Sequence, residues 1–304
     1  MFLGSPAFAL PSLEALIALP GVEVVAVVTQ PDRPAGRGHG TTAPPVKLAA
    51  LERGLTVLQP ENVSAPESLE ALRALAPDVA VVAAYGQILR QRFLDLPVRG
   101  CVNVHASLLP RHRGASPIAA AILADDETSG VTLMEVVRAL DAGPMIARVE
   151  EPILDTDTTG TLEQRISLAG GRLITQSLLP WYEGVLPAVP QDEALVTYAP
   201  QLRREDARLD WSLSAVELWR RVRAFNPWPV AFTTWRDEEL RVLEASPLAG
   251  EGTPGTVMSA GEDGPVVQCG AGRLVLRRVQ RAGKKAQSGV EFARGAREFV
   301  GAVL

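Results

Sequence analysis

The sequence predicts an α/β fold, a doubly wound and mostly parallel sheet, followed by a small antiparallel β-barrel. Two observations support this prediction. Patterns of buried strands and helices alternate through about the first 180 residues, and short strand-like runs separated by turn residues recur toward the C-terminus. At 304 residues, the chain has the length of two domains of ordinary size.

Near-continuous runs of β-branched residues and alanine predict strands buried on both faces over residues 22–29 and 78–84. Shorter runs of the same kind occupy 101–105 and 131–137. Helical patterns, several opening with proline or a capping residue, occupy 7–19, 45–53, 66–75, 117–124 and 161–181. Strands that alternate with helices form βαβ units, in which ligands bind at the carboxyl ends of the strands.

The proline-bearing stretch 185–204 is predicted to be a surface linker between an N-terminal domain, residues 1–184, and a C-terminal domain, residues 205–304. A helix is expected over 214–224. Five short strands follow, separated by Gly, Pro and Asp turns, over 230–234, 240–245, 255–258, 266–269 and 274–279. That spacing fits a small antiparallel barrel, the oligonucleotide-binding type being one option.

Composition excludes several classes of protein. With 47% apolar and 21% charged residues the chain is globular, and it lacks the run of about 18 apolar residues that a membrane span needs. Residues 1–21 carry no Lys or Arg and contain Pro6, Pro11 and Glu14, which argues against a signal peptide. Cys101 and Cys269 stand 168 positions apart, which supports neither a disulfide framework nor a zinc site. We therefore expect a cytoplasmic protein that binds no metal and no membrane.

The net charge of −5 argues against a nucleic-acid partner, but the charge is unevenly distributed. Residues 1–204 hold 16 basic and 22 acidic side chains, whereas residues 205–304 hold 14 basic and 13 acidic ones. Within 277–297, seven basic side chains accompany a single acid, Glu291. By itself this basic run is typical of a solvated face, and a polyanionic partner is the alternative.

Several familiar motifs are missing. The first strand-to-helix turn, residues 4–7, lacks the glycine spacing that binds dinucleotides, and the glycine-rich residues 36–40 fit neither that motif nor a P-loop. The G-x-S-x-G and H-E-x-x-H motifs are also missing. These absences argue against nicotinamide oxidoreductases, NTPases, nucleophile-elbow hydrolases and zinc peptidases.

Three residues suggest acid–base chemistry. Asn103 and His105 occupy alternate positions at the end of a predicted strand, so their side chains point to the same face. An amide donor beside an imidazole can hold the oxygen of a tetrahedral intermediate while a proton moves. Asp141, in a turn after the strand 131–137, is placed to orient the imidazole. Each residue alone is more often a turn former or a hydrogen-bonding group of the core.

The surroundings of this trio resemble those of the folate-dependent formyltransferases. The resemblance rests on residues 103–114 and on Leu-Asp-Ala-Gly, whose aspartate follows His105 by 36 positions. Ala106 and His112 depart from the residues usual there, and we expect neither to take part in the chemistry. Further segments are similar to the members of the family that act on methionyl-tRNA, namely 29–38, 83–86, 195–199, 210–214, 223–229 and 282–285.

The resemblance implies a reaction and roles for the trio. The α-amino group of methionine on initiator methionyl-tRNA would attack the formyl carbon of 10-formyltetrahydrofolate. An α-amino group titrates at roughly 7.7–8.0, so a useful fraction of it is neutral at physiological pH and can attack directly. No protein nucleophile is therefore required. Asn103 and protonated His105 would hold the oxyanion, and Asp141 would fix His105.

The resemblance also implies two binding regions. The N-terminal domain would be catalytic and would bind folate through residues that follow two strands, namely Ala84, Tyr85, Gly86, Ser107, Leu108, Leu109 and Pro110. The loop 30–44 would enter the tRNA acceptor stem with Arg33 and Arg37. In a C-terminal tRNA-binding domain, Arg278, Lys284 and Lys285 would follow the tRNA backbone. We expect the enzyme to be a monomer.

Three alternatives stay open at this point. A folate-dependent formyltransferase acting on another amine, on a sugar nucleotide or glycinamide ribonucleotide, is the main one. A non-catalytic RNA-binding protein would have no need of Asn103, His105 and Asp141 together. A nicotinamide oxidoreductase would need the glycine turn that is missing after the first strand.

Overall fold

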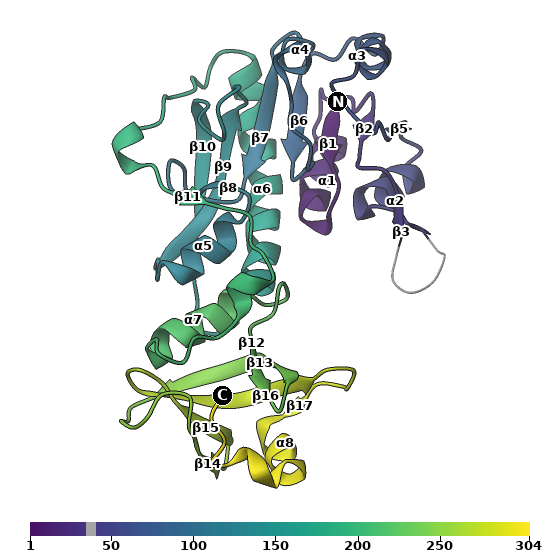
Figure 1. The fold of residues 1–304 in the computed structure, drawn as a ribbon. Helices are drawn as coiled ribbons and strands as arrows, with labels where there is room; N and C mark the ends of the chain where they lie inside the picture. Colours follow the sequence, from purple (N-terminus) through teal and green to yellow (C-terminus); the bar gives the residue numbers. More distant parts are fainter. Residues whose placement is uncertain (35–40) are drawn as a thin grey trace. The chain divides into compact units, whose positions relative to one another are not determined.

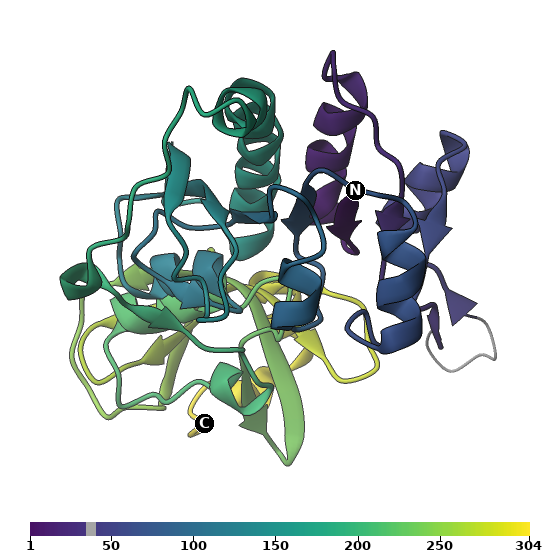
Figure 2. The ribbon, with the colours of Figure 1, turned by 90° about the horizontal axis from the view of Figure 1, so that it is seen from above.

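The computed structural model describes residues 1–34 and 41–304, which form two compact units (Figures 1 and 2). Residues 185–199, from the stretch predicted to be a linker, belong to the first unit. The first unit consists of Met1–Pro117, Thr128–Pro152 and Glu163–Ala199, and the second of Ile118–Glu127, Ile153–Leu162 and Pro200–Leu304.

The first unit is built on a seven-stranded sheet with the strand order β10-β9-β7-β6-β1-β2-β5. Two strands, β9 (Thr128–Glu135) and β10 (Met145–Pro152), run antiparallel at one edge. The other five are parallel: β1 (Phe2–Gly4), β2 (Val27–Val28), β5 (Val57–Leu58), β6 (Ala80–Ala83) and β7 (Cys101–His105). The mostly parallel sheet that the apolar runs predict is confirmed.

The helices begin at the start signals of the sequence. Proline, whose fixed φ and missing N–H suit a first turn, opens α2 (Pro45–Glu52), α3 (Pro66–Arg73) and α5 (Pro117–Leu123). A single short turn of helix, α4 (Gln91–Leu94), follows β6.

Two helices, α1 (Leu10–Ala18) and α6 (Thr159–Tyr182), lie side by side on one face of this sheet (Figure 2). A pair of glycines in α6 allows the close approach. A Cβ on Gly170 would lie 2.8 Å from the Val104 side chain of β7, and one on Gly171 would lie 2.7 Å from the Pro11 carbonyl of α1. Larger residues at these positions would push α6 away from both neighbours.

The second unit contains an antiparallel half-barrel, as the short strand-like runs predict. Its strand path is β12-β13-β16-β15-β14, with β17 paired to β16. The strands are β12 (Phe232–Trp235), β13 (Glu238–Leu248), β14 (Val257–Gly261), β15 (Gly264–Gln268), β16 (Arg273–Arg281) and β17 (Gln287–Ser288).

Two capped helices complete the second unit, α7 (Ala215–Ala224) and α8 (Gly289–Gly295). Each begins with a capping box, in which a serine hydroxyl accepts from the backbone N–H three residues on and a glutamate accepts from the serine N–H. Trp235, Phe292 and Phe299 pack edge to face, with ring centroids 4.9 to 5.9 Å apart.

Within residues 1–34 and 41–304, no helix combines the length and the apolar character needed to cross a membrane.

Candidate active site

Strand β7 carries two of the three predicted catalytic residues. Asn103 and His105 are separated by one residue on this strand, so their side chains leave the same face of the sheet. The His105 side chain is only 6% exposed, whereas Asn103 is half-buried. In the part of the chain that the structure describes, the Asn103 amide has no hydrogen-bond partner. This amide can therefore donate to a substrate oxygen without losing a protein contact.

The imidazole of His105 has a partner at each nitrogen. Nε2 lies 3.1 Å from the backbone carbonyl oxygen of His112, which can only accept, so Nε2 carries a hydrogen and donates. Nδ1 lies 3.7 Å from Oδ2 of Asp141. That separation is within ion-pair range but exceeds a direct hydrogen bond. We expected His112 to take no part in the chemistry, and the contact it makes to the His105 ring comes from its backbone carbonyl.

Asp141 reaches His105 through a loop that folds back over the sheet. β9 runs antiparallel to β7, and its last residue, Glu135, lies opposite Val102 near the start of β7. The loop 136–144 then returns to the level of His105, with Asp141 in the left-handed region at φ 46°. The return requires glycine at position 143, since a Cβ there would lie 1.7 Å from the Glu135 carbonyl oxygen. Oδ2 of Asp141 accepts from the Gly114 N–H at 2.8 Å.

The loop 107–110, which is predicted to line the folate site, is held by buried hydrogen bonds. The Ser107 hydroxyl donates to the Arg111 carbonyl at 2.7 Å, and both Ser107 and Leu109 are fully buried. Thr132 of β9 donates its hydroxyl to the Ser107 carbonyl at 2.7 Å and accepts from the Leu109 N–H at 3.1 Å. Ser107 and Leu109 therefore shape this loop from inside. Thr132, which sequence reasoning missed, supports it.

Two neighbours in the same loop complete the predicted folate set on this side. Leu108 is half-buried and its side chain packs over Gly130. Pro110 is buried and joined to Leu109 by a cis peptide bond.

The three predicted folate residues after β6 differ in exposure, because two lie at the surface and one lies in the core. Ala84 and Gly86 are exposed, with φ values of 48° and 89°. Tyr85 is 2% exposed, and its ring packs in the hydrophobic core, where burial raises the pKa of its hydroxyl well above the ordinary value. Its carbonyl accepts from Ser5 Oγ and Gln30 Nε2, both at 3.2 Å. A ligand here can therefore meet the backbone of this turn but not the phenol ring.

Residues 189–199, hereafter the return segment, pack against residues 112–114, which follow the predicted folate loop. β11 (Tyr198–Ala199) pairs in parallel with β8 (Arg113–Gly114). The Thr197 hydroxyl accepts from the His112 N–H at 2.9 Å. Most of these residues are exposed, as expected of a surface stretch, but they are held to residues about 80 positions earlier by pairing that leaves no periodic signal in the sequence.

The base of the predicted acceptor-stem loop is fixed by ionic contacts. Asp32 accepts from Gln59 at 2.8 Å and from Lys47 at 2.7 Å, and these two hydrogen bonds, that from Gln59 first, lower the pKa of its carboxyl group. Exposed Arg33 starts a two-residue ladder, β3 (Arg33–Pro34) with β4 (Thr41–Thr42), and donates to Gln30 Oε1 at 3.3 Å. Arg37 lies outside the described residues.

In the basic run 277–297, some side chains form ion pairs with acids and others do not. Arg277 pairs with Asp263 at 3.2 Å, and Arg281 pairs with Glu238 at 2.7 Å. The three predicted tRNA contacts, Arg278, Lys284 and Lys285, are exposed, and no ion pair joins them to an acid among the residues described.

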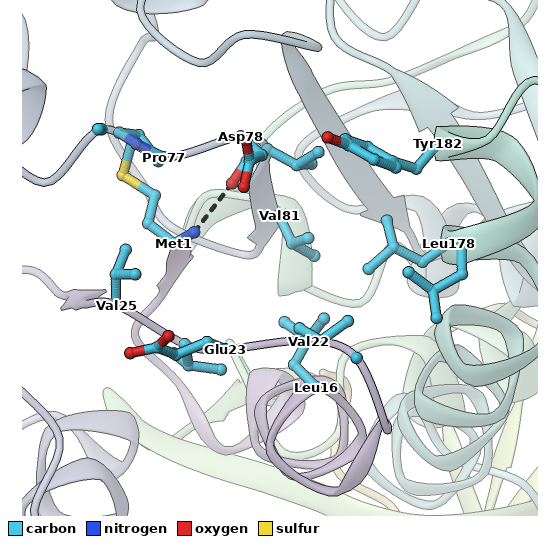
Figure 3. A pocket seen from close by; sticks show the side chains of 15 residues that line it. Met1, Leu16, Val22, Glu23, Val25, Pro77, Asp78, Val81, Leu178 and Tyr182 are labelled. Atoms are coloured by element: carbon cyan, nitrogen blue, oxygen red, sulfur yellow. Dashed lines mark hydrogen bonds between the residues drawn. The ribbon is translucent and has the colours of Figure 1, made fainter.

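A cavity of about 250 Å³ lies near the amino ends of the central strands β1 and β6, whereas the candidate site lies at the carboxyl ends (Figure 3). The Met1 ammonium group donates to the Val79 carbonyl at 2.9 Å beside it. Apolar side chains such as Leu16, Val81 and Leu178 line it, and none of the predicted site residues does. Over the described ranges 1–34 and 41–304, no three His, Cys, Asp or Glu side chains gather as metal ligands would.

Comparisons with known proteins show which family the chain is similar to. A family model described as formyl transferase matches residues 4–178, and one described as formyl transferase, C-terminal domain, matches residues 201–297. A methionyl-tRNA formyltransferase from Acidithiobacillus ferrooxidans is 51% identical over 306 residues, covering 100% of this chain and 97% of the relative. One from Bacillus subtilis is 46% identical over 307 residues, covering 100% and 96%.

Solved structures share the fold at low identity. The N-formyltransferase from Helicobacter canadensis, in complex with folinic acid and dTDP-3-aminofucose, matches with a TM-score of 0.65 and 15% identity, covering 90% of this chain and 97% of that one. HypX from Aquifex aeolicus, in complex with tetrahydrofolic acid, matches with a TM-score of 0.59 and 20% identity, covering 83% and 44%.

Proposed function

This chain belongs to the methionyl-tRNA formyltransferases, and we propose that Asn103, His105 and Asp141 perform its reaction. The enzyme transfers the formyl group of 10-formyltetrahydrofolate to the α-amino group of methionine on initiator methionyl-tRNA. The observation that carries the proposal is the placement of buried His105 between the His112 carbonyl and Asp141, on the same strand face as the unpartnered Asn103 amide.

Direct attack by the substrate amine needs no nucleophile from the protein. A free α-amino group titrates at roughly 7.7–8.0, so a useful neutral fraction is present near pH 7. The two cysteines are unsuited to covalent catalysis, because burial raises the pKa of Cys101 to about 12 and of Cys269 to about 11.

Asn103 and His105 would stabilise the charge that develops on the formyl oxygen. The Asn103 amide donates to that oxygen, and one such preorganised donor contributes about 2.7–4 kcal/mol to transition-state stabilisation. The doubly protonated His105 ring, donating to the His112 carbonyl through Nε2, would bring a positive charge to the same face.

Asp141 would orient His105 and accept the proton that the attacking amine releases. That proton would pass to N10 of the folate as the bond between N10 and the formyl carbon breaks, which leaves tetrahydrofolate. Oδ2 of Asp141 is fixed by the Gly114 N–H at 2.8 Å and stands 3.7 Å from Nδ1 of His105. Catalytic hydrogen bonds are often long before substrate binds and shorten in the reacting complex, so this gap is compatible with proton exchange.

The residues around β6 and β7 fit the folate donor, which supplies the formyl carbon. Ligands of parallel sheets bind beyond the carboxyl ends of the strands, where Ala84, Gly86 and Leu108 lie. Exposed Ala84 and Gly86 would offer backbone polar groups to a flat heterocycle, and Ser107 and Leu109 set the shape of the opposite loop.

We also propose the tRNA contacts, the oligomeric state and the location. Exposed Arg33, Arg278, Lys284 and Lys285, together with Arg37, supply cations for tRNA phosphates. A monomer is supported by the origin of every proposed catalytic group in one chain. A cytoplasmic location is supported by two free buried cysteines and by the tRNA substrate.

The experiment that tests the function is a transfer assay with the purified full-length chain. Formyl transfer from 10-formyltetrahydrofolate to methionyl-tRNA is measured, with uncharged tRNA and free methionine as controls. Transfer to methionyl-tRNA alone supports the assignment. Transfer only to a sugar-nucleotide amine or to glycinamide ribonucleotide would replace it with the main alternative.

A further inference from the structure

One amide side chain in the return segment connects the two loops that hold His105. Gln191 is 9% exposed. Its Nε2 donates to the carbonyl oxygens of Asp141, at 2.7 Å, and Gly143, at 2.8 Å. Its Oε1 accepts from Nε and Nη2 of Arg113, at 3.0 and 2.8 Å. Both donor hydrogens and both lone pairs of the amide are therefore used.

The partners of Gln191 flank the groups that contact His105. Arg113 lies between His112, whose carbonyl accepts from Nε2 of His105, and Gly114, whose N–H donates to the Asp141 carboxylate. On the other side, Gln191 holds the carbonyl group of Asp141 itself and that of Gly143, two residues later. One side chain thus fixes the loop at Nε2 of His105 relative to the loop at Nδ1.

We propose that Gln191 is a positioning residue for formyl transfer, which acts by holding Asp141 in place relative to His105. This inference rests on the proposed roles of His105 and Asp141. Asp141 occupies a left-handed conformation, so its carboxylate depends on the orientation of the peptide that Gln191 holds. A misplacement of about 1 Å in such a group can reduce the rate about 100-fold.

Other contacts keep the return segment in place without Gln191. Val189 exchanges two backbone hydrogen bonds with Met145, each of 2.8 Å. Thr197 accepts from the His112 N–H, and its own carbonyl accepts from the Arg113 N–H at 2.9 Å. The segment is thus anchored on both sides of Gln191, so removal of its amide should leave the fold intact.

The test compares two variants of the full-length enzyme on the same segment. Gln191→Leu removes the amide at similar volume. Glu193→Gln removes the charge that pairs with Arg113 from the outside, where Glu193 is 72% exposed. We expect Q191L to lower kcat about 10- to 100-fold with KM for both substrates within about twofold, and E193Q to match the parent enzyme. Unchanged kcat in Q191L would overturn the proposal.

A double-mutant comparison separates positioning from general damage. If Gln191 acts through Asp141, Q191L causes no further loss of kcat in an Asp141→Ala background. A full additional loss there would show a role independent of Asp141 and would overturn the proposal. Failure of the proposed function is read separately, from an inactive parent enzyme or from an unimpaired D141A variant.

A second substitution keeps the test decisive if Q191L does not fold. Gln191→Glu retains an acceptor for Arg113 but cannot donate to the Asp141 and Gly143 carbonyls when ionised. We expect Q191E to fold, shown by its circular dichroism spectrum and melting temperature, and to lose kcat in the same range as Q191L. Parent-like kcat in folded Q191E would also overturn the proposal.

Discussion

Nδ1 of His105 lies 3.7 Å from Oδ2 of Asp141, while the Gly114 N–H donates to that same oxygen at 2.8 Å. The backbone therefore fixes the carboxylate, and the imidazole faces it without a direct hydrogen bond. This arrangement separates two roles of Asp141, since its position depends on Gly114 and its effect on His105 depends on charge.

Substitution of Asp141 tests which role matters. Asp141→Asn retains an oxygen that can accept from the Gly114 N–H, so the loop should keep its conformation, but the charge beside His105 is lost. We expect kcat to fall about 100-fold or more, as for loss of an acid–base group. Single-turnover transfer measures this, with folate binding as the control. Parent-like turnover in D141N would contradict a role for the charge.

Asn103 should act in the transition state. Its amide has no hydrogen-bond partner among the described residues, so Asn103→Ala should cost little stability. We expect kcat to fall by about 100- to 1,000-fold, the scale for one oxyanion donor. Steady-state kinetics with both substrates distinguish the outcomes, because a rise in KM at unchanged kcat would make Asn103 a binding residue.

Thr132 should stabilise the loop 107–110. Thr132→Val keeps the shape of the side chain but leaves the buried Leu109 N–H and Ser107 carbonyl without their partner. We expect a loss of about 1–3 kcal/mol in the free energy of unfolding, together with weaker folate binding. Urea unfolding and folate titration provide the measurements. Thr132→Ser, which keeps the hydroxyl, should recover most of both, and equal losses in the two variants would exclude the hydrogen bonds as the cause.

The exposed cations of the second unit should contribute to the salt dependence of tRNA binding. Lys284 and Lys285 have no acidic ion-pair partner within the described chain, whereas Arg277 is paired with Asp263. Replacing both lysines with alanine should weaken tRNA binding and reduce the slope of log K against log salt by up to about one per lost phosphate contact. Arg277→Ala is the matched control. An unchanged slope in the lysine variant would show that these residues are only solvated.

Local sequence patterns predicted the strands that are marked by an apolar run and the helices that begin with proline. The apolar run 101–105 coincides with β7, and proline marked the starts of α2, α3 and α5. The predicted strand 22–29 shortens to Val27–Val28, because its neighbour β1 offers partners only at Phe2 and Leu3. β10 was missed altogether, since charged residues such as Arg148 and Glu150 interrupt any apolar run on this edge strand.

The residue types of the site could be predicted from the sequence, but the long-range contacts that hold them could not. The types and spacing of Asn103 and His105 indicated an oxygen-binding, proton-moving pair, because strand periodicity alone places them on one face. Nothing local indicates that the Tyr85 ring turns into the core, where it joins a cluster drawn from several separate segments. Nor does anything local indicate that Gln191 meets Asp141, since that contact joins residues 50 positions apart. Long-range pairing of this kind is decided by the folded structure.

The parallel pair of β8 and β11 determines how the polypeptide can be divided. Ala199 is the last residue of the first unit, and Thr197 and Tyr198 beside it contact His112 and Arg113. A fragment ending at residue 184, where the composition changes, would remove the strand that covers Arg113 and the amide that holds Asp141. A fragment ending at Ala199 would keep both. We expect the shorter fragment to expose residues 107–114 to limited proteolysis and the longer one to protect them, so a fragment that is to keep the proposed site intact must extend some fifteen residues beyond the apparent boundary.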